Sequence, residues 1–368
     1  MAQANDQQTT RTIVDCDVHT AYRTETIRNK IADRLEEPYK SYLTKETLNY
    51  GPYPRDSFPK EGLMSSGGTT EGAVVETPED IEEDLCEGFG VDVAILNSLQ
   101  KFDLIPQRER ARREMRAVND VFVEHFLEGH DEFFGLAMLQ TQDPAAAAEE
   151  IDRMGAEDDI VGALILNGPS DKPLGDPKYD IIYRAAEDND LPLVFHSSAV
   201  GYAVSKKFPF MYNDLQHYGS LHGLSHPFAN MVTVTSLIMN GVPEKFPGLD
   251  FVFLEQDIGI VPLLMHRLNR ETNQQPYEVP LLDKAPEEYI RDQFYWGTQP
   301  MPEAQDNNDV RKTVDLIGPD NIVFTTDHPH SDFDDPSSVV NKYFSHLSEE
   351  DQDKIMYKNA DRVFGLGL

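Results

Sequence analysis

Four side chains of metal-binding type stand at the ends of apolar, strand-like runs in this sequence. Asp17 and His19 follow the first such run, His196 ends one near the middle of the chain, and Asp327 follows the last one. Residues two apart in a strand share a face, so Asp17 and His19 can reach the same ion. Two imidazoles and two carboxylates suit one divalent metal ion, with Zn²⁺ favoured and Mn²⁺ or Fe²⁺ as alternatives.

Such a metal would generate a nucleophile if one of its coordination positions stayed open to water. The metal would lower the pKa of that water to about 7 and so create hydroxide at neutral pH. Asp327 could then act as the general base that holds and moves the proton. The chemistry indicated by these residues is therefore metal-assisted hydrolysis, with Asp327 both a ligand and a catalytic group.

The four side chains need a fold that brings distant strand ends together. Short apolar runs alternate with longer amphipathic segments, which is typical of βα units around a parallel sheet. Eight such strands close a (β/α)₈ TIM barrel, whose sites lie at the carboxyl ends of the strands. We place the eight strands at residues 11–18, 91–96, 133–138, 160–166, 191–195, 250–254, 294–297 and 321–326.

Several longer motifs strengthen this interpretation. They are Val14-Asp15-Cys16-Asp17-Val18-His19, Gly90-Val91-Asp92-Val93-Ala94, Leu193-Val194-Phe195-His196, Gly241-Val242-Pro243-Glu244-Lys245-Phe246-Pro247 leading into Phe251-Val252-Phe253-Leu254-Glu255, Phe324-Thr325-Thr326-Asp327-His328-Pro329-His330, and Lys358-Asn359-Ala360-Asp361-Arg362-Val363-Phe364-Gly365. In these motifs the chain resembles the amidohydrolase superfamily, in the amidohydrolase-related branch that includes metal-dependent decarboxylases similar to aminocarboxymuconate semialdehyde decarboxylase. The resemblance implies a (β/α)₈ barrel with one divalent metal held by the matching Asp17, His19, His196 and Asp327.

The sequence departs from the pattern of that family after the sixth strand. Many members carry a histidine there, as a ligand or a catalytic group, whereas this chain has Glu255. Glu255 is either a catalytic acid that replaces the histidine or an ion-pair partner of Arg267 or Arg270. A fourth-strand lysine that would bridge two metals is also missing, which favours a mononuclear site.

Two further histidines are candidates for the site. His226 precedes Pro227 at the expected start of a helix, so it is either a catalytic acid near the metal or simply the residue before that proline. His330 follows Asp327 closely and could bind substrate in the pocket or hold a lid.

The segment between the first two strands is too long for a βα loop. Residues 21–87 leave the carboxyl end of the first strand, so we interpret them as a lid or cap over the pocket, with a surface embellishment or dimer arm as the alternative. Residues 1–10 are polar and are expected to be a disordered lead-in, which leaves 11–368 as a single barrel domain.

The composition excludes several classes of partner. The 65 Asp and Glu exceed the 32 Lys and Arg and give a formal charge of −33, which repels nucleic acid and anionic membranes. Such an acidic surface favours a salt-adapted, halophilic protein. The sequence shows no apolar run long enough to span a membrane and no disulfide framework among its 2 cysteines. We therefore expect a cytoplasmic enzyme with a small-molecule substrate and, as a mild expectation, a homodimer.

Three hypotheses of function follow. The first is a metal-dependent hydrolase of a small organic substrate, with Asp327 as general base. The alternative on the same scaffold is a nonoxidative decarboxylase, in which the metal orients a carboxylate-bearing ring and a nearby acid protonates the carbon. The third is a barrel that has lost its metal and binds a ligand without catalysis, a hypothesis that rests mainly on Glu255.

Overall fold

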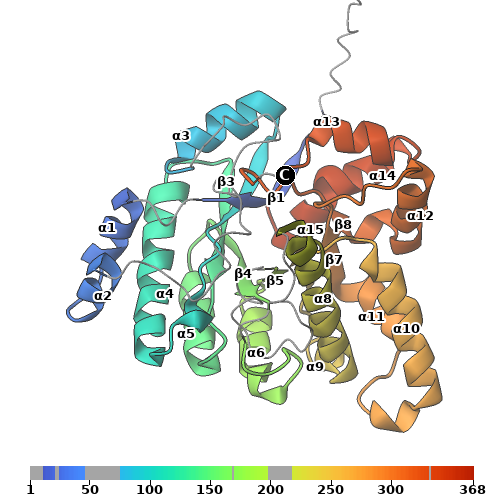
Figure 1. Cartoon of the computed structure of the whole chain (residues 1–368), viewed down its shortest axis with the longest axis horizontal. Coiled ribbons are helices and arrows are strands. Elements are labelled where there is room, and N and C mark those ends of the chain that lie inside the picture. The colour runs from blue at the N-terminus through green and yellow to red at the C-terminus, as the bar shows by residue number, and fades with distance from the viewer. Residues whose placement is uncertain (1–10, 21–24, 46–74, 168–169, 198–217, 331–332) are drawn as a thin grey trace, which may run out of the picture.

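Eight parallel strands form the centre of the molecule (Figure 1). The structure is a computed structural model, and it describes residues 11–20, 25–45, 75–167, 170–197, 218–330 and 333–368. The strands are neighbours in the sheet in their order along the chain, and each pair is parallel. They are β1 (Val14–His19), β2 (Val93–Asn97), β3 (Phe133–Met138), β4 (Ile160–Leu166), β5 (Leu193–His196), β6 (Phe251–Leu254), β7 (Phe294–Gly297) and β8 (Ile322–Val323).

The first strand also pairs with the chain that follows the last one. The backbone N–H of Cys16 donates to the carbonyl of Phe324 at 3.0 Å, and that of His19 donates to the carbonyl of His328 at 2.7 Å. These bonds bring the first and last strands together, so the prediction of a (β/α)₈ TIM barrel is confirmed. The predicted strands agree with the observed ones to within three residues at every end.

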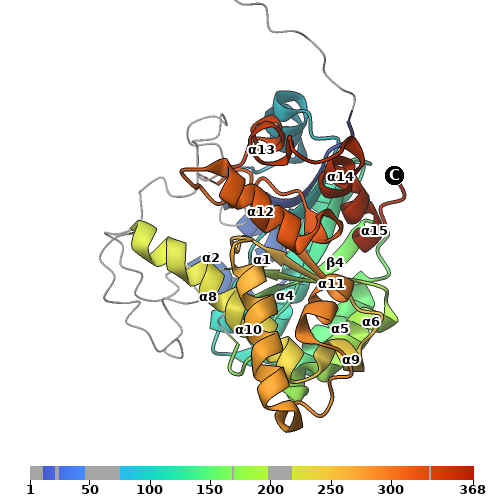
Figure 2. The ribbon, with the colours of Figure 1, turned by 90° about the vertical axis from the view of Figure 1, so that its right-hand side faces the viewer.

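Helices surround the strands (Figure 1). From another side, Figure 2 shows α8 and α10 packed next to each other. Several helices begin where the sequence supplies a cap; Asp143, for example, accepts a hydrogen bond of 3.3 Å from the N–H of Ala146 at the start of α5. The helices are α1 (Glu25–Asp33), α2 (Tyr39–Lys45), α3 (Pro78–Ile81), α4 (Arg108–Phe122), α5 (Pro144–Met154), α6 (Asp180–Asp188), α8 (Tyr218–Met239), α9 (Val242–Lys245), α10 (Ile260–Gln274), α11 (Pro286–Gln293), α12 (Asn307–Ile317), α13 (Pro336–Val339), α14 (Glu349–Asp353) and α15 (Asn359–Phe364).

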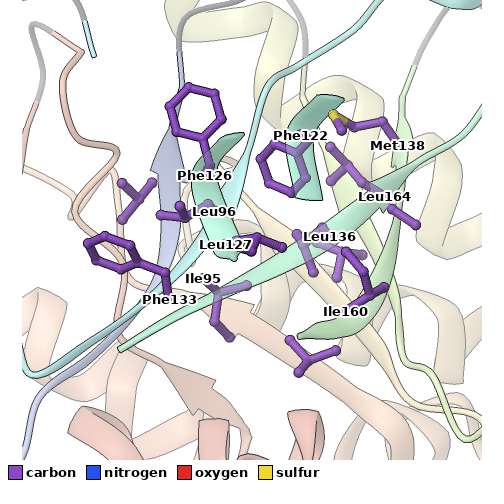
Figure 3. Packing of buried hydrophobic residues seen from close by; sticks show 14 of the residues in the cluster. Ile95, Leu96, Phe122, Phe126, Leu127, Phe133, Leu136, Met138, Ile160 and Leu164 are labelled. Atoms are coloured by element: carbon purple, nitrogen blue, oxygen red, sulfur yellow. The ribbon is translucent and has the colours of Figure 1, made fainter. Parts of the chain in front are cut away.

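Figure 3 shows how one helix packs on the barrel wall. Phe122 at the end of α4 and Leu127 in the wide turn that continues it lie against strands β2 to β4. A Cβ atom on Gly135 of β3 would lie 2.5 Å from the Phe122 ring and 2.7 Å from Leu127 Cδ1. The helix can therefore approach this strand closely only because residue 135 is glycine.

Only part of the segment 21–87 is described, and within that part α1 and α2 pack against α4. Ile27 and Ile31 of α1 are buried in the core cluster that includes residues of α4. An ion pair of 2.5 Å joins Glu36, between α1 and α2, to Arg113 of α4. Residues 21–24 and 46–74 lie outside the described residues, as do residues 1–10, so the lid, the lead-in and the single-domain boundary stay predictions.

None of the described helices combines the length and the apolar character needed to cross a membrane.

Candidate metal centre

The four predicted ligands lie together at the carboxyl ends of the strands. Asp17 and His19 are on β1, His196 is the last residue of β5, and Asp327 lies four residues beyond the end of β8. One ligand atom from each lies within 4.8 Å of the others, and all four side chains are buried. The barrel thus brings together residues separated by some 300 positions in the chain.

The proton of His19 is fixed by its neighbour on the next strand. Register pairs His19 with Asn97, and His19 Nδ1 lies 3.0 Å from Asn97 Oδ1. Because that oxygen only accepts hydrogen bonds, Nδ1 donates, and the lone pair of Nε2 faces Asp327 Oδ1 at 2.7 Å. Two acceptors at this distance need a cation between them. Burial lowers the pKa of His19 to about 3, so the ring itself favours the neutral form.

His196 presents the same arrangement on the other side of the cluster. Its Nδ1 donates to the carbonyl of Ser197 at 2.6 Å, which leaves Nε2 facing Asp17 Oδ2 at 3.3 Å. Neither of these two facing atoms has a hydrogen-bond partner among the described residues, although both are buried. Burial alone would lower the pKa of His196, but the charge of Asp17 raises it to about 9.

These observations fit a divalent metal ion. Two histidine Nε2 atoms and two carboxylates converge with lone pairs directed at one another, and both histidines are held by acceptors at Nδ1, as metal-bound histidines usually are. The donor set of two nitrogens and two carboxylates suits Zn²⁺ and Mn²⁺ alike.

The carboxylates are held by the backbone of β1 and of the chain after β8. The N–H of Asp327 donates to the carbonyl of Asp17 at 3.1 Å. Asp327 has a left-handed backbone with φ of 64°. Residues other than glycine rarely adopt this conformation, and those that do are enriched at functional sites. Asp15, buried beneath them, accepts from the N–H groups of Asp17 and Thr326, and burial raises the pKa of Asp15 to about 7.

His330 lies between the cluster and solvent. Its Nδ1 is 2.7 Å from Asp327 Oδ1, and its ring lies on that of His19 with the centroids 4.3 Å apart. The side chain is 18% exposed, whereas Asp327 is fully buried. His330 therefore lies beside the cluster, and its place in a substrate pocket and its role in binding substrate stay predictions.

Glu255 lies beside the cluster and contacts histidines. Its Oε2 is 3.5 Å from His196 Nδ1, and its Oε1 is 3.3 Å from His226 Nε2. Among the described residues Glu255 forms no ion pair with Arg267 or Arg270, the alternative partners, and Arg267 instead pairs with Glu271 of its own helix at 2.8 Å. The imidazole of His226 holds the pKa of Glu255 below its usual range despite the burial of the carboxylate.

The expected position of His226 at the start of a helix is also wrong. α8 begins at Tyr218 and contains Pro227 in its interior. His226 consequently points from within the helix to Glu255, and in the described part of the chain its imidazole contacts the metal cluster through that carboxylate. The catalytic roles predicted for both residues are not tested by this geometry.

Three residues of the site were not singled out by the sequence pattern. Asn97 holds both Asp17 and His19, and the only available signal was its place at the end of the second strand. Asp15 lies two residues before Asp17 and so shares its face. His222 of α8 has its Nε2 3.5 Å from Glu255 Oε1, and its spacing of four residues from His226 on a helix was the available signal.

An eight-stranded parallel barrel with a buried cluster of metal-type ligands at the carboxyl ends of its strands defines a class of enzymes. Residues 89–366 match the model of the amidohydrolase family. Because this match spans more than half of the chain, the chain belongs to the amidohydrolase family and is an enzyme of that family. The hypothesis of a barrel without catalysis is therefore not supported.

Comparison with individual proteins points to decarboxylases. Gamma-resorcylate decarboxylase from Rhizobium sp. (strain MTP-10005) is 27% identical over 302 residues, which cover 78% of this chain and 87% of that protein. The fold is shared with 5-carboxyvanillate decarboxylase from Sphingomonas paucimobilis, with a TM-score of 0.71, 18% identity, and coverage of 96% of this chain and 99% of that one. It is also shared with dihydroxybenzoic acid decarboxylase from Polaromonas sp. JS666, solved with bound manganese and the inhibitor 2-nitroresorcinol, with a TM-score of 0.69, 20% identity, and coverage of 97% and 98%.

Proposed function

We propose that this protein is a nonoxidative decarboxylase that releases CO₂ from a hydroxylated aromatic carboxylic acid. The observation that carries the proposal is the buried cluster of Asp17, His19, His196 and Asp327, in a chain that aligns with gamma-resorcylate decarboxylase over most of the length of both. Hydrolysis, the first hypothesis from the sequence, uses the same cluster but has no named relative among those compared above. The decarboxylase alternative is therefore the better supported of the two.

The four ligands would hold the metal, which when bound supplies the positive charge that orients the carboxylate and an adjacent hydroxyl of the substrate. The Polaromonas relative was solved with manganese, so Mn²⁺ stands beside Zn²⁺ as the candidate. The side chains of the protein carry out all other steps of the reaction.

The reaction replaces a carbon–carbon bond by a carbon–hydrogen bond. A proton adds to the ring carbon that bears the carboxylate, the bond to that carboxylate breaks, its electron pair returns to the ring, and CO₂ leaves. We assign delivery of the proton to Asp327, whose Oδ1 is 2.7 Å from His330 Nδ1. His330 is half-buried, so it can contact the substrate and return a proton from solvent to Asp327.

Glu255 and His226 act on the reaction indirectly, without contact with the aromatic ring of the substrate. Glu255 faces the Nδ1 side of His196 and His226 faces Glu255, so this pair would hold a metal ligand in its orientation. Both are therefore positioning residues in the decarboxylation that we propose.

The proposal is tested by supplying metal-loaded enzyme with dihydroxybenzoates and 5-carboxyvanillate, and in parallel with amides and lactones. We expect equal amounts of CO₂ and phenolic product from an aromatic acid, with one deuterium at the vacated ring carbon when the reaction runs in D₂O. Asp327→Asn should abolish both products, whereas Asp309→Asn on the exposed face of α12 should leave them unchanged. Hydrolytic product without CO₂ would refute the proposal.

A further inference from the structure

A second group of metal-type side chains lies next to the first cluster and shares none of its ligands. It consists of His222 and His226, one turn apart on α8, and Glu255 after β6. Residues four apart on a helix share a face, so both imidazoles project to the same side. Their Nε2 atoms lie 3.5 Å and 3.3 Å from one and the same oxygen, Glu255 Oε1.

The spacing of these three atoms is that of ligands around a common ion. N–H···O hydrogen bonds measure about 2.7–3.2 Å between heavy atoms, and both separations are longer. Ligand atoms at about 2.0–2.1 Å from a tetrahedral Zn²⁺ lie roughly 3.3–3.4 Å from each other. Two histidines and one glutamate are also a set that Zn²⁺ uses in catalytic sites, with the fourth position open.

The hydrogen bonds of His226 allow a tautomer that directs a lone pair to the carboxylate. Its Nδ1 lies 3.1 Å from the carbonyl oxygen of His222. Nδ1 lies equally close, at 3.1 Å, to Ser225 Oγ, a hydroxyl that can donate to it. In the tautomer whose Nδ1 donates to the His222 carbonyl, Nε2 faces Glu255 Oε1 as a second acceptor. A cation then lies between these two atoms, either a proton on the ring or a metal ion. An acceptor at Nδ1 is also what fixes the orientation of a histidine that binds metal through Nε2.

Burial and backbone geometry give further support. The side chains of Glu255 and His226 are 8% and 6% exposed, so a carboxylate here needs a compensating charge. His222 is 20% exposed, so this side of the group is accessible to solvent. Glu255 has a left-handed backbone with φ of 52°, so the chain adopts a rare conformation where it places this carboxylate.

We propose that His222, His226 and Glu255 form a second site for a divalent transition-metal ion of the Zn²⁺ type. The fourth strand lacks the lysine that would bridge two metal ions, so a pair bridged by that residue is excluded. The second site needs no bridging residue, because it shares no ligand with the first centre. The second site adjoins the first centre at Glu255, because the other oxygen of this carboxylate, Oε2, faces His196 Nδ1 at 3.5 Å.

The test counts metal ions and does not depend on any activity. Protein stripped with a chelator is titrated with Co²⁺ or Zn²⁺, and bound metal is measured by mass spectrometry after desalting, with the visible absorption of Co²⁺ as a second readout. The wild type should bind two ions per chain. His222→Gln and Asp17→Asn should each bind one, and the double variant none.

Two controls make the result decisive. His130→Gln removes the central residue of the more exposed group Glu82, His130 and Glu132, and it should still bind two ions. His226→Gln should repeat the loss seen for His222→Gln, with folding of each variant checked by circular dichroism. One ion in the wild type, two in His222→Gln, or a loss in His130→Gln would each overturn the proposal.

Discussion

The side-chain amide of Asn97 donates a hydrogen bond of 3.0 Å to Asp17 Oδ1, and its own oxygen accepts one from His19. One residue on β2 thus orients both metal-type side chains of β1 and sets the proton of His19 on Nδ1. Partners of this kind typically account for a factor of 10–100 in metal affinity.

Asn97→Ala should accordingly weaken binding of the first metal by about 10–100-fold. Competition with a chromophoric chelator would measure the change. Asn119→Ala is the matched control, because Asn119 is another buried asparagine that binds the backbone of Met138 and the carboxylate of Glu150 instead. The control should lower thermal stability and leave metal affinity as it was. Equal affinities for Asn97→Ala and the wild type would contradict the role given to Asn97.

His330→Gln should separate catalysis from metal binding. His330 touches Asp327 but is not one of the four ligands, so the variant should keep its metal while kcat falls about 10²–10⁴-fold, the usual contribution of a proton-transfer group. Metal content and kcat measured on the same preparation check this. A loss of metal together with activity would show that His330 supports the ligands, and an unchanged kcat would remove it from the reaction.

The parts of the structure that could be predicted from the sequence are those encoded locally. The apolar run before His196 and the cap at Asp143 are both formed by neighbours in the chain, and the strand that ends at His196 was placed correctly. The last strand was predicted to be longer than it is, because residues after Val323 pair with β1 through separate bonds rather than as a continuous ladder.

The parts that could not be predicted depend on register and on contacts between distant elements. Asn97 joins the site because the β1–β2 register sets it opposite His19. His222 joins because α8 begins before it and continues through Pro227, against the usual preference of proline for the first turn. Glu255 could not be assigned to histidine or arginine partners from the sequence, since the choice depends on how α8 and α10 lie on the barrel.

Salt should stabilise this protein. A net charge of −33 makes the folded chain repel itself, and the Debye length falls from about 10 Å at 0.1 M to about 3 Å at 1 M salt. Salt also screens surface ion pairs such as that of Lys312 with Asp309, but exposed pairs contribute only about 0–1 kcal/mol each. The repulsion should dominate, so Tm should rise by several degrees between 0.1 M and 2 M KCl, with activity following. Full stability and activity in dilute buffer would contradict the halophilic interpretation.

Asp250, just before β6, should make the folded protein less stable as the pH rises. A carboxylate in an ion pair has the opposite effect. Burial raises the pKa of Asp250 to about 6, and the nearby charge of Arg362 only partly offsets this. In the unfolded chain the carboxyl ionises near pH 4. Above pH 6 the folded protein therefore carries a buried charge at a cost of roughly 3 kcal/mol. Well below pH 4 neither state is ionised, and the cost vanishes.

Asp250→Asn should therefore raise Tm at pH 8, with a gain that shrinks as the pH falls through 6 and is lost below 4. Thermal melts of both proteins across this range measure the difference. The exposed Asp158→Asn provides the control and should show no such dependence. A gain that is constant with pH would mean that the variant acts through packing rather than through the ionisation of Asp250, because only the charged carboxylate pays for burial above its folded pKa.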